Sequence, residues 1–214
     1  MKIGIISDVH SNLYSLMEVY SELEKQDVDT IVCLGDIVGY GPHPNEVISF
    51  IRRKRIMSLI GTYDMAIVKN DFTFINESTI NSFSLDFTRD ELTKNNLYYL
   101  SNLPHEFRIE FNDFKLRFIH KNPYDDENIE ENILVCGCTH MAYENRIGKD
   151  KYILNPGSVG RPNRNNGNLT FGILNVSDKF YEFRIMNVSC PFHKIEKDMK
   201  MMKFPEILIS SYDV

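Results

Sequence analysis

The chain has 214 residues, a length that suits one large domain with a full hydrophobic core, and we expect a single domain over residues 1–214. Its 24 lysines and arginines are outnumbered by 30 aspartates and glutamates, a net charge of −6, which argues against nucleic acid and anionic membranes as partners. With 43% apolar and 25% charged residues, the composition is that of a soluble globular protein and excludes a disordered or fibrous one.

The first part of the chain alternates short apolar runs with amphipathic stretches. Lys2–Ser7 and Thr30–Gly35 are brief and rich in β-branched residues, which is typical of buried parallel strands. Between them, apolar residues recur at helical spacing over Leu13–Leu23, after a predicted helix cap at Ser11 or Asn12. The pattern therefore predicts a strand, a helix and a second strand.

The alternation continues with a helix after Pro44 and a third apolar run over Ile56–Gly61, which gives a βαβαβ pattern. From Asn70 to Leu103 the periodicity is again helical, and Pro104 ends it. The rest of the chain is predicted to be rich in strands. These are expected at Phe114–His120, Ile133–Gly137, Lys151–Leu154, Leu169–Val176 and Phe180–Met186.

The two ends of the chain carry their own predictions. The apolar run at the start stops at Asp8, too early for a signal peptide or a membrane span, and the four cysteines lack the spacing of a disulfide-rich domain. We therefore expect a cytoplasmic protein with reduced thiols. The segment after Pro191 carries Met199 and Phe204, and is expected to pack on the core or on a second copy of the chain, so a homodimer is one expected state.

Side chains able to bind metal ions follow five of the apolar runs. Because the carboxyl ends of neighbouring strands share one edge of a sheet, we expect these side chains to converge there. An isolated aspartate after a strand is often a helix cap, and an isolated histidine is usually a surface or core residue, but neither alternative accounts for the whole set. The set comprises Asp8, His10, Asp36, Thr62 to Asp64, His120, Cys138 and His140. His43, His105 and His193 have no such companions and are expected to be ordinary surface or core residues.

In order and spacing, these positions resemble the five signature blocks of the calcineurin-like metallophosphoesterases, above all the small single-domain phosphodiesterases. The blocks are Asp8-Val9-His10, Gly35-Asp36-Ile37-Val38-Gly39, Gly61-Thr62-Tyr63-Asp64, His120 and Gly137-Cys138-Thr139-His140. The likeness covers roughly residues 1 to 190 and includes the turn at Asn155–Gly160. It implies an α/β fold, a four-layer α/β/β/α sandwich of two mixed sheets, with the site on their shared edge.

The resemblance also implies two divalent metal ions, manganese, iron or zinc, bridged by Asp36. Carried over position by position, the first ion would be held by Asp8, His10, Asp36 and His140. The second would be held by Asp36 and His120, together with two positions where the family has asparagine and histidine. Those two positions are Thr62 and Cys138 in this chain.

Both substitutions alter the second metal position. The hydroxyl of Thr62 reaches less far than an asparagine carbonyl and coordinates weakly, whereas a Cys138 thiolate is a strong, soft ligand for zinc or iron at about 2.3 Å. The second site is therefore expected to be weak or retuned toward zinc or iron. The alternative is that Cys138 is a small buried residue at a position where a ligand was lost.

Tyr63 occupies the position of the family's catalytic histidine, with Asp64 orienting it. A tyrosine hydroxyl donates a hydrogen bond there, but with a usual pKa near 10 it is poorly suited to proton transfer at neutral pH.

Two functions follow from the resemblance. The first is a phosphoesterase that hydrolyses a small phosphorylated substrate, a phosphodiester or nucleotide, by attack of a metal-bound hydroxide. The second is a catalytically weakened binding or scaffold module, like the retromer subunit that resembles these phosphodiesterases. Thr62 and Cys138 favour the second function. The complete first metal site favours the enzyme, because loss of function should erode both sites, and the enzyme is the function that we expect.

Overall fold

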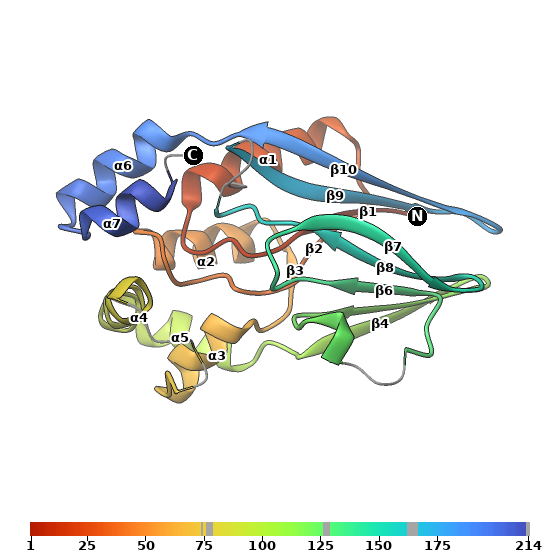
Figure 1. Ribbon diagram of the computed structural model, residues 1–214, viewed down its shortest axis with the longest axis horizontal. Coiled ribbons are helices and arrows are strands. Elements are labelled where there is room, and N and C mark those ends of the chain that lie inside the picture. The colour runs from red at the N-terminus through yellow and green to blue at the C-terminus, as the bar shows by residue number, and fades with distance from the viewer. Residues whose placement is uncertain (74, 76–78, 126–128, 162–166, 213–214) are drawn as a thin grey trace.

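The computed structural model describes residues 1–73, 75, 79–125, 129–161 and 167–212, and its strands form two mixed five-stranded sheets packed against each other (Figure 1). In the first sheet the strand order is β10-β9-β1-β2-β3, and in the second it is β4-β5-β6-β8-β7. The first sheet contains β1 (Lys2–Ile6), β2 (Thr30–Cys33), β3 (Met57–Ser58), β9 (Asn168–Val176) and β10 (Tyr181–Ser189). The second contains β4 (Glu106–Phe111), β5 (Phe114–Ile119), β6 (Ile133–Cys136), β7 (Ala142–Gly148) and β8 (Lys151–Pro156). The predicted pair of mixed sheets is confirmed.

The predicted βαβαβ unit is confirmed in the first sheet, where β1, β2 and β3 are parallel and connected through α1 (Leu13–Lys25) and α2 (Pro44–Arg53). Helix α1 begins after Asn12, whose side chain accepts the backbone N–H of Ser15 at 3.1 Å. Strand β3 is shorter than predicted. After Ser58 the chain turns toward the helices, and the N–H of Ile60 bonds to the carbonyl of Pro104 instead of to β2.

The predicted helical region contains α4 (Thr79–Glu91) and α5 (Lys94–Ser101), and a further helix, α3 (Thr62–Lys69), precedes it. Sequence periodicity did not predict α3, β4 or β7. The last two are edge strands whose side chains are partly exposed, so they lack the apolar runs that mark buried strands.

Alternate side chains along β1 pack into two different hydrophobic cores. Ile3 and Ile5 point between the sheets, where they pack with residues such as Phe118 and Val135 of the second sheet. Ile6 points the other way, into a core formed with α1 and α2. Within the second sheet, Ile119, Leu134, Cys136 and Ile153 form a smaller core, against which the loop residue Ile129 packs. The short turn η1 (Pro123–Asp125) follows β5.

The segment after Pro191 folds back on the same chain as α6 (Phe192–Met201), α7 (Glu206–Ile209) and η2 (Ser210–Tyr212). Met199 and Phe204 are buried in a small core that also includes Tyr40, so packing on the core of the same chain is confirmed.

All four cysteines are free thiols. Within the described ranges, no helix combines the length and the apolar character that crossing a membrane requires.

Candidate metal centre

The candidate site lies where strands of both sheets end. Asp8 and His10 follow β1, and Asp36 follows β2, both in the first sheet. His120 follows β5, and His140 follows β6, both in the second sheet. The two sheets therefore each supply part of one site, as the convergence of strand ends predicted.

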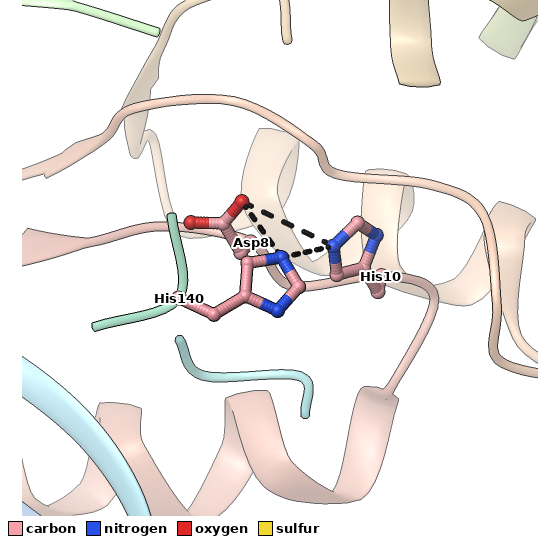
Figure 2. A group of neighbouring side chains, drawn as sticks. All are labelled: Asp8, His10 and His140. Atoms are coloured by element: carbon pink, nitrogen blue, oxygen red, sulfur yellow. Dashed lines mark hydrogen bonds and ion pairs between the residues drawn. The ribbon is translucent and has the colours of Figure 1, made fainter. Parts of the chain in front are cut away.

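The first group of potential ligands is Asp8, His10 and His140, whose side chains point toward one another in Figure 2. The Nε2 atoms of His10 and His140 are 3.0 Å apart, and Asp8 Oδ1 lies 3.3 Å from His140 Nε2 and 4.0 Å from His10 Nε2. Asp8 and His10 are fully buried, whereas the side chain of His140 is 32% exposed. Solvent therefore reaches this group on the side of His140.

The second group is Asp8, Asp36 and His120. Asp36 Oδ2 lies 3.3 Å from His120 Nε2 and 3.9 Å from His10 Nε2, so this carboxylate faces histidines of both groups. Its other oxygen, Oδ1, accepts the backbone N–H of Tyr63 at 2.8 Å. That hydrogen bond fixes the carboxylate relative to the start of α3.

Left-handed backbone torsions orient the ligand-bearing residues. The φ angles are 54° at Asp8, 47° at His10, 51° at Asp36, 77° at Cys138 and 58° at His140. Such values are uncommon for residues other than glycine, and each costs free energy that the surrounding structure must offset. Their concentration at one place indicates that the loops are folded to present side chains, which strand periodicity does not reveal.

The orientation of two histidines suits metal binding. Nδ1 of His10 lies 3.3 Å from the carbonyl of Val38, and Nδ1 of His120 lies 3.1 Å from the carbonyl of Leu34. A carbonyl only accepts hydrogen bonds, so in each case Nδ1 carries a hydrogen and Nε2 is the ring nitrogen that faces the site.

Electrostatics differ between the two groups. Burial lowers the pKa of His10 to about 3, so this ring is neutral. Burial also works to lower the pKa of His120, but Asp36 outweighs it and raises that pKa well above its usual value. Burial works to raise the pKa values of Asp8 and Asp36, but neighbouring histidines outweigh it and lower both, so both are carboxylates.

These donors fit divalent metal ions. Asp8 Oδ1 and His120 Nε2 are buried and have no hydrogen-bond partner of suitable geometry among the described residues. His140 Nε2 lies 3.3 Å from Asp8 Oδ1, and Asp36 Oδ2 lies 3.3 Å from His120 Nε2. Nε2 of His10 also faces Nε2 of His140 at 3.0 Å, a separation that a proton or a cation between the two nitrogens stabilises. Imidazole and carboxylate ligands suit zinc, iron and manganese.

Thr62 and Cys138 lie on the side of His120. Thr62 is the first residue of α3 and, together with His120, lines a cavity of about 190 Å³. The thiol of Cys138 is within hydrogen-bonding reach of His120, and its backbone N–H donates to Asp8 Oδ2 at 3.3 Å. Cys138 belongs to neither compact ligand group found in the described chain.

The hydroxyl of Tyr63 is hydrogen-bonded to that of Tyr40. The carboxylate of Asp64 accepts backbone N–H groups of Ile37, Val38 and Gly61 at 3.2, 3.0 and 2.9 Å, and therefore holds the loop that carries Asp36. Burial and the charge of Asp36 raise the pKa of Asp64 to about 7.

Sequence reasoning did not identify Tyr40 and Arg161 as part of the site. The rings of Tyr40 and His10 meet edge to face, with their centres 4.7 Å apart. The guanidinium carbon of Arg161 lies 4.1 Å from the centre of the Tyr40 ring. In the sequence, Tyr40 directly follows the Gly35–Gly39 block, where Tyr40-Gly41-Pro42 is itself similar to the family, and Arg161 directly follows the Asn155–Gly160 turn. His43 is a buried histidine whose Nε2 lies 3.1 Å from Asp198 Oδ2, away from both ligand groups.

The chain is similar to known proteins over most or all of its length. Residues 1–179 match the family model described as the calcineurin-like phosphoesterase superfamily domain. An uncharacterized protein of Methanocaldococcus jannaschii is 28% identical over 96% of this chain and 95% of its own. The crystal structure of a metallophosphoesterase from Sphaerobacter thermophilus covers 100% of this chain and 98% of its own, with a TM-score of 0.78 and 26% identity. A hypothetical protein from Pyrococcus horikoshii shares the fold with a TM-score of 0.81 at 20% identity, over 98% of this chain and 96% of its own.

Proposed function

The chain belongs to the calcineurin-like phosphoesterase superfamily and is a hydrolase, and from this premise we propose that it cleaves a phosphodiester or nucleotide-type substrate at a dinuclear metal centre. The position of Asp36 carries the proposal. Its Oδ2 atom faces His10 of one ligand group and His120 of the other, at 3.9 and 3.3 Å, which is the placement that a bridging carboxylate requires. This geometry supports two ions that share one ligand.

We assign the first ion to Asp8, His10, Asp36 and His140. The second ion takes Asp36 and His120, with Thr62 and Cys138 as weaker or altered ligands. The neighbourhood of His120 and the Cys138 thiol supports a second site retuned toward zinc or iron, because thiolates favour these metals over manganese. The first site has only nitrogen and oxygen donors.

Divalent cations held by these residues would supply positive charge to the phosphoryl group and would lower the pKa of water, which would make a nucleophile available at neutral pH. The protein positions the other groups. Burial, reinforced by Tyr40, raises the pKa of Tyr63, so its hydroxyl keeps its proton and donates a hydrogen bond toward the phosphoryl group or the leaving oxygen. Asp64 acts as a positioning residue, because its three hydrogen bonds hold the backbone near Asp36.

The cavity beside His120 supports a small substrate. Its volume of about 190 Å³ is too small for a folded protein segment. Its lining includes the basic side chain of Lys121, together with Arg117, which is paired with Glu106 of the same cavity. A basic side chain beside a metal site favours an anionic substrate. We therefore propose that a small phosphorylated molecule binds with part of its structure in this cavity.

Metal counting and turnover test the proposal together. The purified protein is expected to bind two divalent ions per chain by elemental analysis and to cleave a chromogenic phosphodiester when manganese, zinc or iron is added. Asp36→Asn is expected to reduce both the metal content and the turnover, because it weakens a ligand shared by both ions. Less than one ion per chain with no turnover under any metal would refute the enzyme.

A double variant tests the second metal position. Thr62→Asn combined with Cys138→His restores the family's usual ligands, so turnover with manganese is expected to rise. Each single variant serves as a control, since one restored ligand should give a smaller gain. An unchanged or lower rate with manganese in the double variant would contradict the assigned role of these two positions.

The altered ligands at Thr62 and Cys138 also favour a second candidate, a binding module on the same fold. Under that hypothesis the protein keeps its first metal ion but has no turnover on phosphodiesters or phosphomonoesters with any metal. The activity measurement therefore separates the two candidates.

A further inference from the structure

The backbone before Arg161 is fixed to the loop that carries the first metal ligands. The N–H of Gly160 donates to the carbonyl of Asp8 at 2.8 Å, and the hydroxyl of Ser158 donates to the same carbonyl at 3.0 Å. The N–H of Arg161 in turn donates to the Ser158 hydroxyl at 3.1 Å. The backbone of Arg161 is therefore held close to the backbone of Asp8.

Aromatic rings hold the side chain of Arg161 beside the metal centre. Its guanidinium carbon lies 4.1 Å from the centre of the Tyr40 ring and 5.7 Å from that of Tyr212, whose side chain is buried. The Tyr40 ring itself contacts His10. A guanidinium stacked on a ring keeps its N–H donors along its edges, where they remain able to bind an anion.

The charge of Arg161 has no carboxylate partner within the described residues. In contrast, Arg89, Arg108 and Arg117 all form ion pairs with aspartate or glutamate. An arginine held next to a phosphoesterase site, without a protein anion to neutralise it, is suited to an anion that arrives with the substrate.

We propose that Arg161 binds non-bridging oxygens of the substrate phosphate, on the Tyr40 side of the metal centre. This inference rests on the proposed function and adds a direct phosphate-binding residue to it. The planar fork of arginine matches two phosphate oxygens at once, which lysine does not. The competing explanation is structural, because Arg161 also joins Tyr40 to the C-terminal turn at Tyr212.

Titration with inorganic phosphate tests the proposal without relying on turnover. The metal-loaded protein is titrated in a calorimeter as wild type, Arg161→Gln and Arg161→Lys. Loss of a charge-assisted pair of hydrogen bonds is expected to weaken phosphate binding about tenfold or more in Arg161→Gln, with unchanged metal content. Arg161→Lys keeps the charge but loses the fork, so we expect an intermediate loss of about threefold to fivefold.

Arg146→Gln is the matched control. The guanidinium of Arg146 also lies over a tyrosine ring, 5.9 Å from the centre of Tyr152, but it is on β7 and belongs to no part of the site. This variant is expected to bind phosphate like the wild type. In turnover assays, Arg161→Gln should raise KM, and Arg146→Gln should not.

The outcomes separate the inference from the proposed function. If phosphate affinity is the same in the wild type and both Arg161 variants, or if the metal-loaded wild type binds no phosphate, the inference is wrong. A lower melting temperature alone would then assign Arg161 a structural role. If the wild type binds metal and phosphate but cleaves no ester, the proposed function fails, while weaker phosphate binding in Arg161→Gln still supports this residue as the phosphate ligand. Should Arg161→Gln fail to fold, the comparison of Arg161→Lys with the wild type decides.

Discussion

A methyl group at Gly160 is expected to disrupt the first metal site without changing any ligand. A Cβ atom there would lie 1.9 Å from the carbonyl oxygen of Val9 and 2.8 Å from that of Asp8. To restore an ordinary contact, these backbone segments must separate by about 1.5 Å. Both atoms belong to the backbone, so rotation of a side chain cannot relieve the clash. We expect Gly160→Ala to lower the free energy of unfolding by about 1–3 kcal/mol.

The same displacement should cost metal affinity. The ligand atoms of Asp8, His10 and His140 lie within 4.8 Å of one another, and a shift of about 1 Å in the Asp8 loop removes them from the tolerance of a metal site. Elemental analysis after dialysis is expected to show about one ion fewer per chain, and a thermal scan should show a melting temperature lower by roughly 3–10 °C.

Gly148→Ala is the control for this prediction, because a Cβ atom there would have its nearest neighbour at 3.7 Å, an ordinary contact. It should retain the metal content of the wild type and nearly its melting temperature. If Gly160→Ala behaves like Gly148→Ala, the close approach of the two loops does not hold the first metal site, and the reasoning is refuted.

Three further predictions concern the protonation of His120, the packing of Met199 in the C-terminal core and the hydroxyl of Tyr63. Because Asp36 raises the pKa of His120, an ion at the second position must displace a proton, so its affinity should rise with pH until His120 is neutral. Calorimetry in buffers of different ionisation enthalpy measures that proton, and no release at pH 6 would contradict the prediction. Met199→Ala should lower the free energy of unfolding in urea by about 2–4 kcal/mol because Met199 is fully buried, whereas Met201→Ala should change it by less than about 0.5 kcal/mol because Met201 is 72% exposed. Equal effects of the two would argue against the packing of α6. Tyr63→Phe should lower turnover about tenfold while elemental analysis finds the same metal content, and an unchanged rate would exclude a role for the hydroxyl.

Local pattern predicted the central strands well. Parallel strands such as β1 and β2 are short apolar runs rich in β-branched residues, and the amphipathic helix between them shows helical spacing. The edge strands β4 and β7 were missed because their partly exposed side chains leave no such run. The sequence pattern does not predict the helix at Thr62 because it is short and because one hydrogen bond at its start, from the N–H of Tyr63 to Asp36, comes from a distant segment.

The sequence by itself determined which side chains meet at the strand ends, because the types of the ligand residues and their order along the chain can be read from the sequence alone. It predicted that Asp8, His10, Asp36, His120 and His140 converge, with Thr62 and Cys138 on the side of His120, and the structure brings the first five into two neighbouring groups. Only the tertiary structure decided how these side chains face one another. The left-handed torsions of the loops and the close approach of Gly160 to Val9 depend on contacts between distant segments.

The same reason explains why Arg161 was not predicted. An arginine after a turn has no periodic or spacing signal, and its importance arises from two tyrosines that lie 121 and 51 residues away along the chain, Tyr40 and Tyr212. Charges that act through space are set by the fold, whereas the ligands of a metal are set by the residue types that the sequence carries.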